Sequence, residues 1–425
     1  MPDRSYAAAE KYILSREFFG MKLGLANITE FLDSIGCPQT KYKTIHIAGT
    51  NGKGSTAALL ESVLRAQGFK TGLFTSPHLV SLRERIRVNG KMIPTSSVAA
   101  FIGRYRRVLS RRKLSFFELI TAMALEHFAR TGVEIAVVET GLGGRLDASN
   151  VLTPEMTITT DISRDHVEIL GSSIRKIARE KAGIIKPGVP HLIGMLPEPA
   201  ADVMRQRCTQ LKAPLYKLTG GNVSFHPEAM SLDFRHNGLA IRGLKPSLVG
   251  VYQLKNTALA LKAVAILRNR GWRVSKRAIV KGIRGTVWPG RFEIREYRGK
   301  PTHIFDVSHN ASGVASFVET YKLIFGERKA KIITGFVKRK EHQKMFDSLS
   351  TIAESYALVP LRTGRSVELS EMVSSINWRG VPYRRHGSLK SAYSKVLNSS
   401  ANDDVVIVIG SHYLVGEFYN WYKRR

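Results

Sequence analysis

Residues 44–56 read TIHIAGTNGKGST. A short apolar run leads into three glycines and a lysine, and an apolar helical pattern then continues as far as Gly68. Glycines let backbone N–H groups approach oxygen atoms closely, a helix N-terminus adds positive potential, and Lys53 adds a full charge. The stretch therefore predicts a strand, a phosphate-binding turn and a helix, with Ser55 or Thr56 available as a hydroxyl ligand for magnesium.

The match to the common phosphate-binding pattern is imperfect. That pattern has glycine where this chain has Ile47, and Ser or Thr where this chain has Gly54. A glycine-rich turn without a ligand is the alternative interpretation. The lysine inside the glycine run favours phosphate binding.

The composition is that of a globular protein. The chain has 425 residues, of which 43% are hydrophobic and 23% charged, and this length predicts more than one domain. No apolar run approaches the ~20 residues that a membrane-spanning helix needs. The first 19 residues include acidic side chains and no apolar core, so we expect no signal peptide and a cytoplasmic location. Cys37 and Cys208 match no metal or disulfide pattern and are expected to be buried free thiols.

The formal net charge of +31 is unusual and is spread along the chain. Such a charge attracts anionic substrates and, nonspecifically, nucleic acid. A general basic bias among the proteins of the source organism would explain it equally well. One basic run is interpreted as a solvated helix face; it comprises Arg104, Arg106, Arg107, Arg111, Arg112 and Lys113.

Two helical stretches are expected within residues 1–43, and strands then alternate with helices. The strand predictions are residues 44–48, 71–75, 135–139, 156–160 and 190–194, with helices at 117–131 and 173–182 among those between them. This alternation predicts a mostly parallel sheet covered by helices. Ligands of such sheets bind at the carboxyl ends of the strands, which places Ser76, Glu139 and Asp161 beside the glycine loop.

The second part of the chain repeats this pattern after an interruption. Short strands are predicted in residues 222–250, and a helix from Asn256 to Arg270. The Trp288-Pro-Gly-Arg291 segment is the predicted hinge. Strands at 303–307, 331–335, 355–359 and 405–409 follow, with helices starting at Ala311 and Glu341. The predicted fold is an α/β protein: a P-loop-type, mostly parallel sheet domain over 1–290, including the N-terminal helical segment, and a smaller Rossmann-like α/β domain over 291–425.

Together these motifs resemble the Mur ligases, and within them the folylpolyglutamate synthase/dihydrofolate synthase branch. The resemblance runs through nearly the whole chain. It rests on residues 49–55 (GTNGKGS), 75–79 (TSPHL), 116–118 (FFE), 139–147 (ETGLGGRLD), 165–166 (DH), 170–171 (LG), 180–185 (EKAGII), Gln253 with Asn256, 289–292 (PGRF), Asp306 with His309-Asn310, and 410–411 (GS).

The resemblance implies an ATP-dependent ligase of the Mur central-domain type. Such an enzyme phosphorylates a carboxylate, and the amino group of L-glutamate then displaces the phosphate. The implied acceptors are dihydropteroate, the γ-carboxylate of a folate, or both, and the implied cofactors are ATP and two Mg²⁺ ions. The residues that the resemblance assigns to the nucleotide are Gly49, Thr50, Asn51, Gly52, Lys53, Gly54, Ser55, Asn256, Arg291 and Asp306.

The resemblance also implies the metal ligands Ser76, Glu139, His166 and Lys181, the last as a carbamylated lysine. Glu139 ends an apolar strand, where a carboxylate is costly unless it is paired or bound to metal. For Ser76, an ordinary Ser-Pro turn is the alternative. The predicted catalytic residues are Lys53, Lys181, His166 and His309.

The pterin-bearing substrate is assigned by resemblance to three regions. The first is around residues 23–26. The second region comprises Ser115, Phe116, Phe117 and Glu118, and the third comprises Leu146, Asp147 and Ala148. The anionic tail of the substrate is assigned separately, to Arg83 with Arg85. Phe117 can stack on a flat pterin or belong to the core.

Two departures from the family pattern affect the second domain. Ala311 stands where the family usually has proline, and Arg339-Lys-Glu341 replaces Asp-Lys-Asp. Alternative interpretations are a Mur-type ligase with another carboxylate acceptor and a basic P-loop protein that binds nucleic acid. The latter requires a basic face with interleaved aromatic residues, which the sequence lacks. We therefore expect a monomer with small-molecule substrates, no specific nucleic acid and no membrane partner.

Overall fold

The computed structural model describes residues 4–16, 24–376 and 380–422. Its centre is an eight-stranded sheet with the strand order β4-β3-β2-β5-β1-β6-β7-β8. The strands are β1 (Lys43–Ala48), β2 (Thr71–Phe74), β3 (Ile86–Val88), β4 (Lys91–Met92), β5 (Ile135–Glu139), β6 (Met156–Thr159), β7 (His191–Ile193) and β8 (Leu215–Lys217). All neighbours are parallel except β2 with β3 and β3 with β4. We call this the first sheet.

Helices cover both faces of the first sheet, because side chains alternate between the faces along each strand. Ile45 and Ile47 pack on one face against α3 (Lys53–Gln67), α9 (Val251–Asn269) and α10 (Lys276–Arg284). Ala136 and Val138 pack on the other face. The helices of that face are α1 (Arg4–Ser15), α2 (Ala26–Ser34), α4 (Thr95–Arg111) and α5 (Phe116–Arg130).

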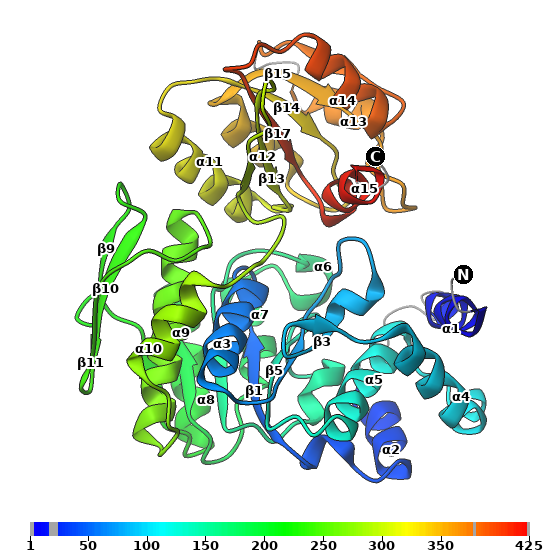
Figure 1. Cartoon of the computed structure of the whole chain (residues 1–425), viewed down its shortest axis with the longest axis vertical. Helices are drawn as coiled ribbons and strands as arrows, with labels where there is room; N and C mark the ends of the chain where they lie inside the picture. The colour runs from blue at the N-terminus through cyan, green and yellow to red at the C-terminus, as the bar shows by residue number, and fades with distance from the viewer. Residues whose placement is uncertain (1–3, 17–23, 377–379, 423–425) are drawn as a thin grey trace.

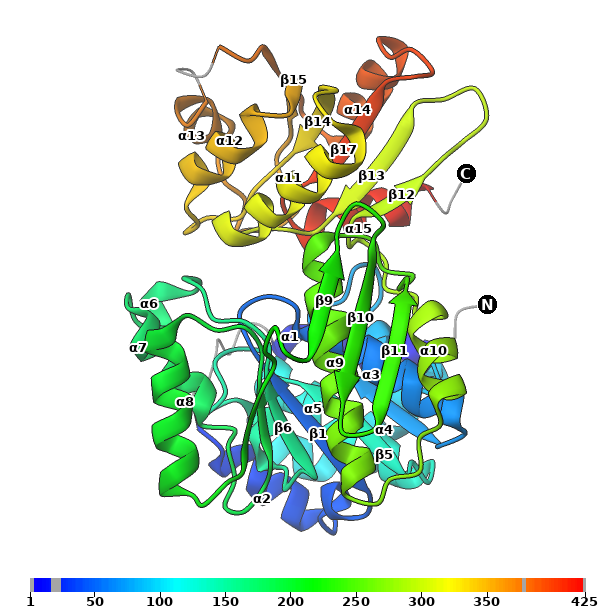
Figure 2. The same ribbon diagram turned by 90° about the vertical axis from the view of Figure 1, so that its left-hand side faces the viewer.

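Further helices and a small sheet complete this part of the chain. Beyond β6 lie α6 (Val167–Leu170), α7 (Ile174–Ala182) and α8 (Glu198–Gln210). Three short 3₁₀ turns are η2 (Pro38–Thr40), η3 (Leu82–Arg85) and η4 (Ala148–Val151). An antiparallel sheet packs against α9 and is seen face-on in Figure 2; its strands are β9 (Val223–His226), β10 (Ser231–His236) and β11 (Leu239–Leu244).

A second large sheet forms after residue 291, and Figure 1 shows it above the first. Its order is β12-β13-β17-β14-β15-β16, and only β12 is antiparallel to its neighbour. The strands are β12 (Glu293–Arg295), β13 (Thr302–Asp306), β14 (Ala330–Thr334), β15 (Ala353–Leu358), β16 (Tyr383–Arg385) and β17 (Val405–Ile409). The helices are α11 (Ala311–Phe325), α12 (His342–Ser350), α13 (Leu369–Ser374), α14 (Leu389–Asn398) and α15 (His412–Tyr422).

The predicted α/β class is confirmed, and the predicted strands and helices form close to their expected bounds. The largest difference in bounds is at α9, which begins at Val251 rather than Asn256 because Gly250, at φ 131°, turns the chain directly into the helix. No strand of the two large sheets crosses the Trp288–Arg291 segment, while the domain boundary at 290 stays a prediction.

Two smaller expectations have different outcomes. Cys208 is a buried free thiol as predicted, whereas Cys37 is partly exposed. The backbone of Cys37 is left-handed, at φ 47°, and the residue directly precedes the surface turn η2. The prediction that Cys37 is buried was therefore wrong. In the described part of the chain, no helix combines the length and apolar character that a membrane crossing requires.

Candidate active site

The glycine loop joins β1 to α3 and is closed in by its surroundings. A Cβ atom at Gly49 would lie 1.9 Å from the Thr160 hydroxyl oxygen, and one at Gly52 would lie 2.3 Å from Asn256 Oδ1. Gly52 is also left-handed, at φ 81°, where it precedes the first turn of α3. Only glycine fits these two positions, so the backbone N–H groups at the helix N-terminus stay accessible for an anion.

This loop forms the floor of a cavity of about 370 Å³ between the two large sheets. The lining includes the whole loop from Gly49 to Ser55, the end of β5, residues at both ends of α6, the first turns of α9 and α11, and the start of α15. The predicted residues that line it are Lys53, Ser76, Glu139, His166, Lys181, Asn256, Arg291, Asp306 and His309. The structure thus brings the predicted nucleotide and metal residues together.

A buried carboxylate faces this cavity from the end of β5. Glu139 is only 3% exposed, and its Oε2 accepts the backbone N–H of Ser76 at 3.1 Å. Burial raises the pKa of Glu139, and the Lys53 ammonium, 3.9 Å away, opposes that rise. The distance to Lys53 is too long for a hydrogen bond, so the Glu139 carboxylate can accept a divalent ion.

Lys181 lies on the other side of the glycine loop, at the last turn of α7. It is 3% exposed, and its Nζ donates a hydrogen bond to the Gly49 carbonyl at 2.7 Å. Burial, together with the charge of Lys53, lowers the pKa of Lys181 to about 7. A substantial neutral fraction of this amine is therefore present near neutral pH.

A polar junction between the two sheets closes one side of the cavity. Asn310 at the start of α11 donates to Asn51 Oδ1 at 3.0 Å and to Asp165 Oδ2 at 3.2 Å. Lys340 forms a buried ion pair with Asp165. Burial alone would raise the pKa of Asp165, but His309 and Lys340 hold it below its usual range. The junction therefore ties the second sheet to the glycine loop.

Asp306, at the end of β13, is held entirely by protein groups. Its Oδ2 accepts the Tyr252 hydroxyl at 3.0 Å and the Phe292 N–H at 2.7 Å, and its Oδ1 accepts the Ser308 N–H at 2.7 Å. Because Tyr252 belongs to α9, this carboxylate links α9 to the second sheet. Oδ1 accepts only one of these bonds, so it keeps a lone pair that a ribose hydroxyl in the cavity could use.

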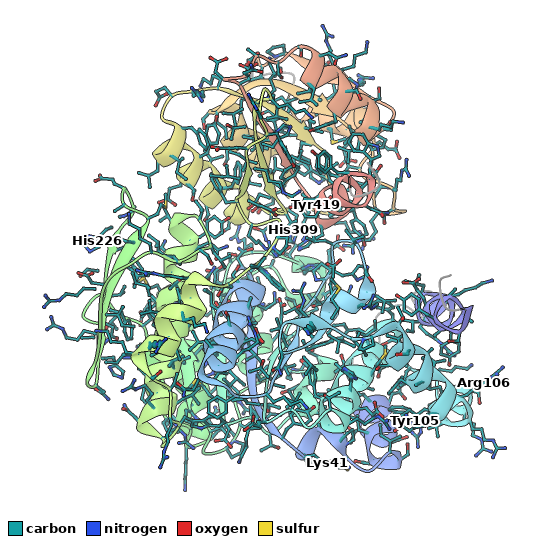
Figure 3. All side chains as sticks on the ribbon, in the orientation of Figure 1. Lys41, Tyr105, Arg106, His226, His309 and Tyr419 are labelled. Carbon is teal, nitrogen blue, oxygen red and sulfur yellow. The ribbon has the colours of Figure 1, made fainter. Side chains whose placement is uncertain are left out.

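Arg291 and two histidines lie where the chain passes from one sheet to the other. Arg291 Nη2 lies 3.2 Å from His412 Nε2, and the rings of His412 and His309 are 5.3 Å apart. Figure 3 shows His309 at this junction. Burial lowers the pKa of His309 to about 4, so the imidazole is neutral. Its Nδ1 faces the Val307 carbonyl at 3.0 Å, which fixes the ring.

Known proteins with similar sequences identify the family of this chain. The sequence matches the Mur ligase middle domain over residues 47–264 and the Mur ligase glutamate ligase domain over residues 290–412. A dihydrofolate synthase/folylpolyglutamate synthase from Bacillus subtilis is 32% identical over 97% of this chain and 98% of its own length. The chain belongs to the folylpolyglutamate synthase/dihydrofolate synthase branch of the Mur ligases.

Solved structures of this branch share the whole fold. E. coli FolC in complex with DHPP and ADP has a TM-score of 0.89 and 28% identity over 98% of both chains. Mycobacterium tuberculosis folylpolyglutamate synthase complexed with ADP has a TM-score of 0.90 and 27% identity over 99% of both chains. The resemblance that the sequence motifs indicated is therefore confirmed, while the roles of individual residues stay predictions.

The residues that the folate-ligase resemblance assigned to the pterin do not line the 370 Å³ cavity. Ser115 and Glu118 form a reciprocal cap at the start of α5. The Phe117 ring packs 5.9 Å from that of Phe74, and Phe116 lies 5.2 Å from the Arg85 guanidinium. These side chains, and those of Leu146, Asp147 and Ala148, lie outside that lining, and Leu23 is outside the described residues.

Arg83 is likewise not directed into this cavity. Its Nε donates to the Ile93 carbonyl at 2.6 Å, an attachment within the β3–β4 region. The clamp on the anionic substrate therefore stays a prediction with no contact to the cavity in this conformation.

Sequence reasoning missed several cavity residues of this Mur ligase. Tyr252, Lys255 and His412 all line the cavity. Tyr252 was missed because the helix prediction began too late, at Asn256. His412 directly follows the Gly410-Ser411 motif, so its position carried a signal, but the partner Arg291 lies far away in sequence.

Proposed function

We propose that this protein joins L-glutamate to dihydropteroate, to the γ-carboxylate of a folate, or to both, at the expense of ATP. The observation that carries the proposal is the convergence of Lys53, Glu139 and Lys181 on one cavity between the two sheets. The phosphates of ATP, a metal ion and the acceptor carboxylate can therefore bind close together in this cavity.

The reaction has two balanced steps. An oxygen of the acceptor carboxylate attacks the γ-phosphorus of ATP, ADP leaves, and an acyl phosphate forms. The amino nitrogen of glutamate then attacks the acyl carbon, loses its proton, and inorganic phosphate departs with the former carboxylate oxygen. The protein assists both steps by positioning and by stabilising charge.

Each residue has a distinct proposed role. The glycine loop and Lys53 hold the phosphates, Asn256 and Arg291 contact the nucleotide or its phosphates, and Asp306 lies on the ribose side. His309, neutral and fixed by the Val307 carbonyl, orients the incoming amine. The pterin is assigned to the region of residues 115–118 and 146–148, where Phe117 offers an aromatic face.

The residues present fit a magnesium site. Mg²⁺ accepts one or two protein carboxylates together with phosphate oxygens and water, so few protein ligands are needed. Glu139, which is buried with the Lys53 ammonium 3.9 Å away, and the Ser76 side chain supply hard oxygens for one ion. His166 and a carbamylated Lys181 are proposed for a second ion. Bound magnesium would neutralise the phosphate charge.

The physiological context is proposed from the same resemblance. We propose that the protein acts as a monomer in the cytoplasm on small-molecule substrates. Light scattering of the purified protein tests the monomer, and a stable dimer at micromolar concentration would contradict it.

Arg291→Ala should lower kcat/KM by about a hundredfold while changing thermal stability little. Arg291 lies at the crossing between the two sheets and lines the cavity with the glycine loop, and we expect closure over ATP to bring its guanidinium onto the phosphates. Steady-state kinetics and thermal unfolding measure the two effects. Arg298→Ala, an exposed arginine a short distance along the chain, serves as the matched control and should be unaffected.

Small-angle scattering tests the closure itself. We expect the radius of gyration to fall when an ATP analogue and dihydropteroate are added together. An unchanged radius, or an Arg291→Ala variant defective only in folding, would contradict the role of the hinge.

The experiment that tests the proposed activity is ATP-dependent incorporation of labelled glutamate with dihydropteroate and tetrahydrofolate as separate acceptors. Turnover with at least one of them supports the proposal and says which activity is present. No turnover with either, but turnover with a peptidoglycan-type carboxylate precursor, would overturn it.

A further inference from the structure

His46 lies in the middle of β1, between the apolar residues Ile45 and Ile47. Ile45 and Ile47 point to the face of α3, so His46 points to the opposite face, and it is 0% exposed. Its Nε2 lies 2.8 Å from Ser149 Oγ, in η4. A polar side chain in such a position requires a reason, since an apolar one would pack there at no cost in hydrogen bonding.

Ser149 connects His46 to Asp147. The Ser149 hydroxyl lies 2.5 Å from Asp147 Oδ1, which also accepts the Ser149 backbone N–H at 3.0 Å. Asp147 Oδ2 accepts the Leu142 N–H at 2.8 Å. The carboxylate is therefore directed toward the backbone of the loop from Gly141 to Gly144, which we call the cavity loop.

The cavity loop is held tightly between two helices. Gly141, Leu142 and Gly143 line the 370 Å³ cavity directly after Glu139. A Cβ at Gly141 would lie 2.5 Å from the Phe117 ring of α5, and one at Gly144 would lie 2.8 Å from the Glu180 carbonyl of α7. A shift of this loop therefore disturbs Glu139 on one side and the helix carrying Lys181 on the other.

The hydrogen bonds determine where the protons are. Backbone N–H groups donate to both oxygens of Asp147, so the carboxylate acts as an acceptor and the Ser149 hydroxyl donates to it. Ser149 Oγ then accepts from His46, which requires the proton on Nε2. Within residues 4–16, 24–376 and 380–422, the buried Nδ1 of His46 has no hydrogen-bond partner, and a bare lone pair there costs less than an unpaired N–H.

Charge is consistent with this arrangement. Burial and the nearby Lys186 lower the pKa of His46 to about 3, so the ring is neutral at physiological pH. Burial raises the pKa of Asp147, while hydrogen bonds from Ser149, Leu142 and Gly141 oppose that rise. The hydrogen bonds therefore run in one fixed direction, from His46 through Ser149 to the accepting carboxylate of Asp147.

We propose that His46 is a positioning residue that, through Ser149 and Asp147, holds the cavity loop in the conformation needed for the acceptor carboxylate and Glu139. The expected effect of His46 on turnover rests on the proposed function. The expected tautomer of His46 and the geometry of the cavity loop do not depend on that function.

The chain offers a matched control for the kinetic test. His191 in β7 is also 0% exposed in the same sheet and contacts hydroxyl groups of Thr157 and Thr159, at 2.8 and 3.3 Å. Neither of these threonines contacts the cavity loop through a hydrogen bond that the structure shows. His191→Leu therefore reports the cost of replacing a buried strand histidine alone.

The experiment compares His46→Leu, His46→Gln and His191→Leu in glutamate incorporation and thermal unfolding. We expect His46→Leu to lower kcat/KM for the acceptor about ten- to a hundredfold, a size typical of a misplaced site. His46→Gln, whose amide can still donate to Ser149, should recover part of that loss, and His191→Leu should change stability only. Equal loss in His46→Leu and His46→Gln, or in His46→Leu and His191→Leu, would overturn the proposal.

A second measurement holds even if these variants fold poorly. In nitrogen-15 spectra of histidine-labelled wild-type protein, assigned through the backbone, the ring of His46 should be neutral with its proton on Nε2 and should stay so between pH 5 and 9. A proton on Nδ1 of His46 would overturn the proposal. Wild-type protein without ligase activity but with this tautomer would refute the proposed function alone.

Discussion

Lys53→Ala should abolish turnover while leaving the fold intact. The Lys53 ammonium lies 3.3 Å from the Thr50 carbonyl and 3.9 Å from Glu139, with its side chain 15% exposed at the cavity. Its removal loses one long hydrogen bond to a backbone carbonyl and one long ion pair, so the free energy of unfolding should change by only about 1 kcal/mol. Its charge faces the region where the phosphates bind, so we expect a loss in kcat of at least about a hundredfold.

The measurement is glutamate incorporation together with thermal unfolding of the same preparation. Lys70→Ala, an exposed lysine beyond the other end of α3, is the control and should behave as wild type. A Lys53→Ala variant that still couples glutamate near the normal rate would show that the glycine loop does not hold the phosphates.

Lys181→Ala should be nearly inactive and should be partly rescued by short carboxylates such as acetate. A free ammonium at this site would repel magnesium, whereas a carbamate has the opposite sign and two oxygens. Carbamylation needs the neutral amine, and burial with the charge of Lys53 already lowers the pKa of Lys181 to about 7. An added carboxylate can occupy the space that the lysine leaves.

Lys181→Arg separates charge from volume. The guanidinium fills the same space with the wrong charge, so this variant should be inactive and should not respond to acetate. Lys176→Ala, on the exposed face of α7, is the control and should retain activity. An unmodified amine at Lys181 in a crystal structure with ATP and magnesium, together with full activity of Lys181→Ala, would refute the carbamate.

The parts of the fold that the sequence predicted are those determined locally. The apolar run of β1, the glycines and the helical pattern of α3 are contiguous, so their spacing alone predicts a strand, a turn and a helix. Glu139 could be placed for the same reason, because a carboxylate ending an apolar strand lies at the carboxyl edge of a parallel sheet.

The parts that could not be predicted depend on contacts between distant residues. His46 and Ser149 are 103 positions apart, and Asn51 and Asn310 are 259 apart. Nothing in the local sequence at either end indicates the partner. A local pattern can also be ambiguous. The spacing of Ser115 and Glu118 fits a helix cap as well as a substrate contact, and the structure shows the cap.

The most direct test of the ligase mechanism follows one oxygen atom. Dihydropteroate, or tetrahydrofolate if it is the better acceptor, is labelled with oxygen-18 in its reacting carboxylate and turned over with ATP and glutamate. An acyl phosphate predicts one labelled oxygen in each inorganic phosphate released, with ADP as the other product. Unlabelled phosphate, or release of AMP, would contradict the mechanism.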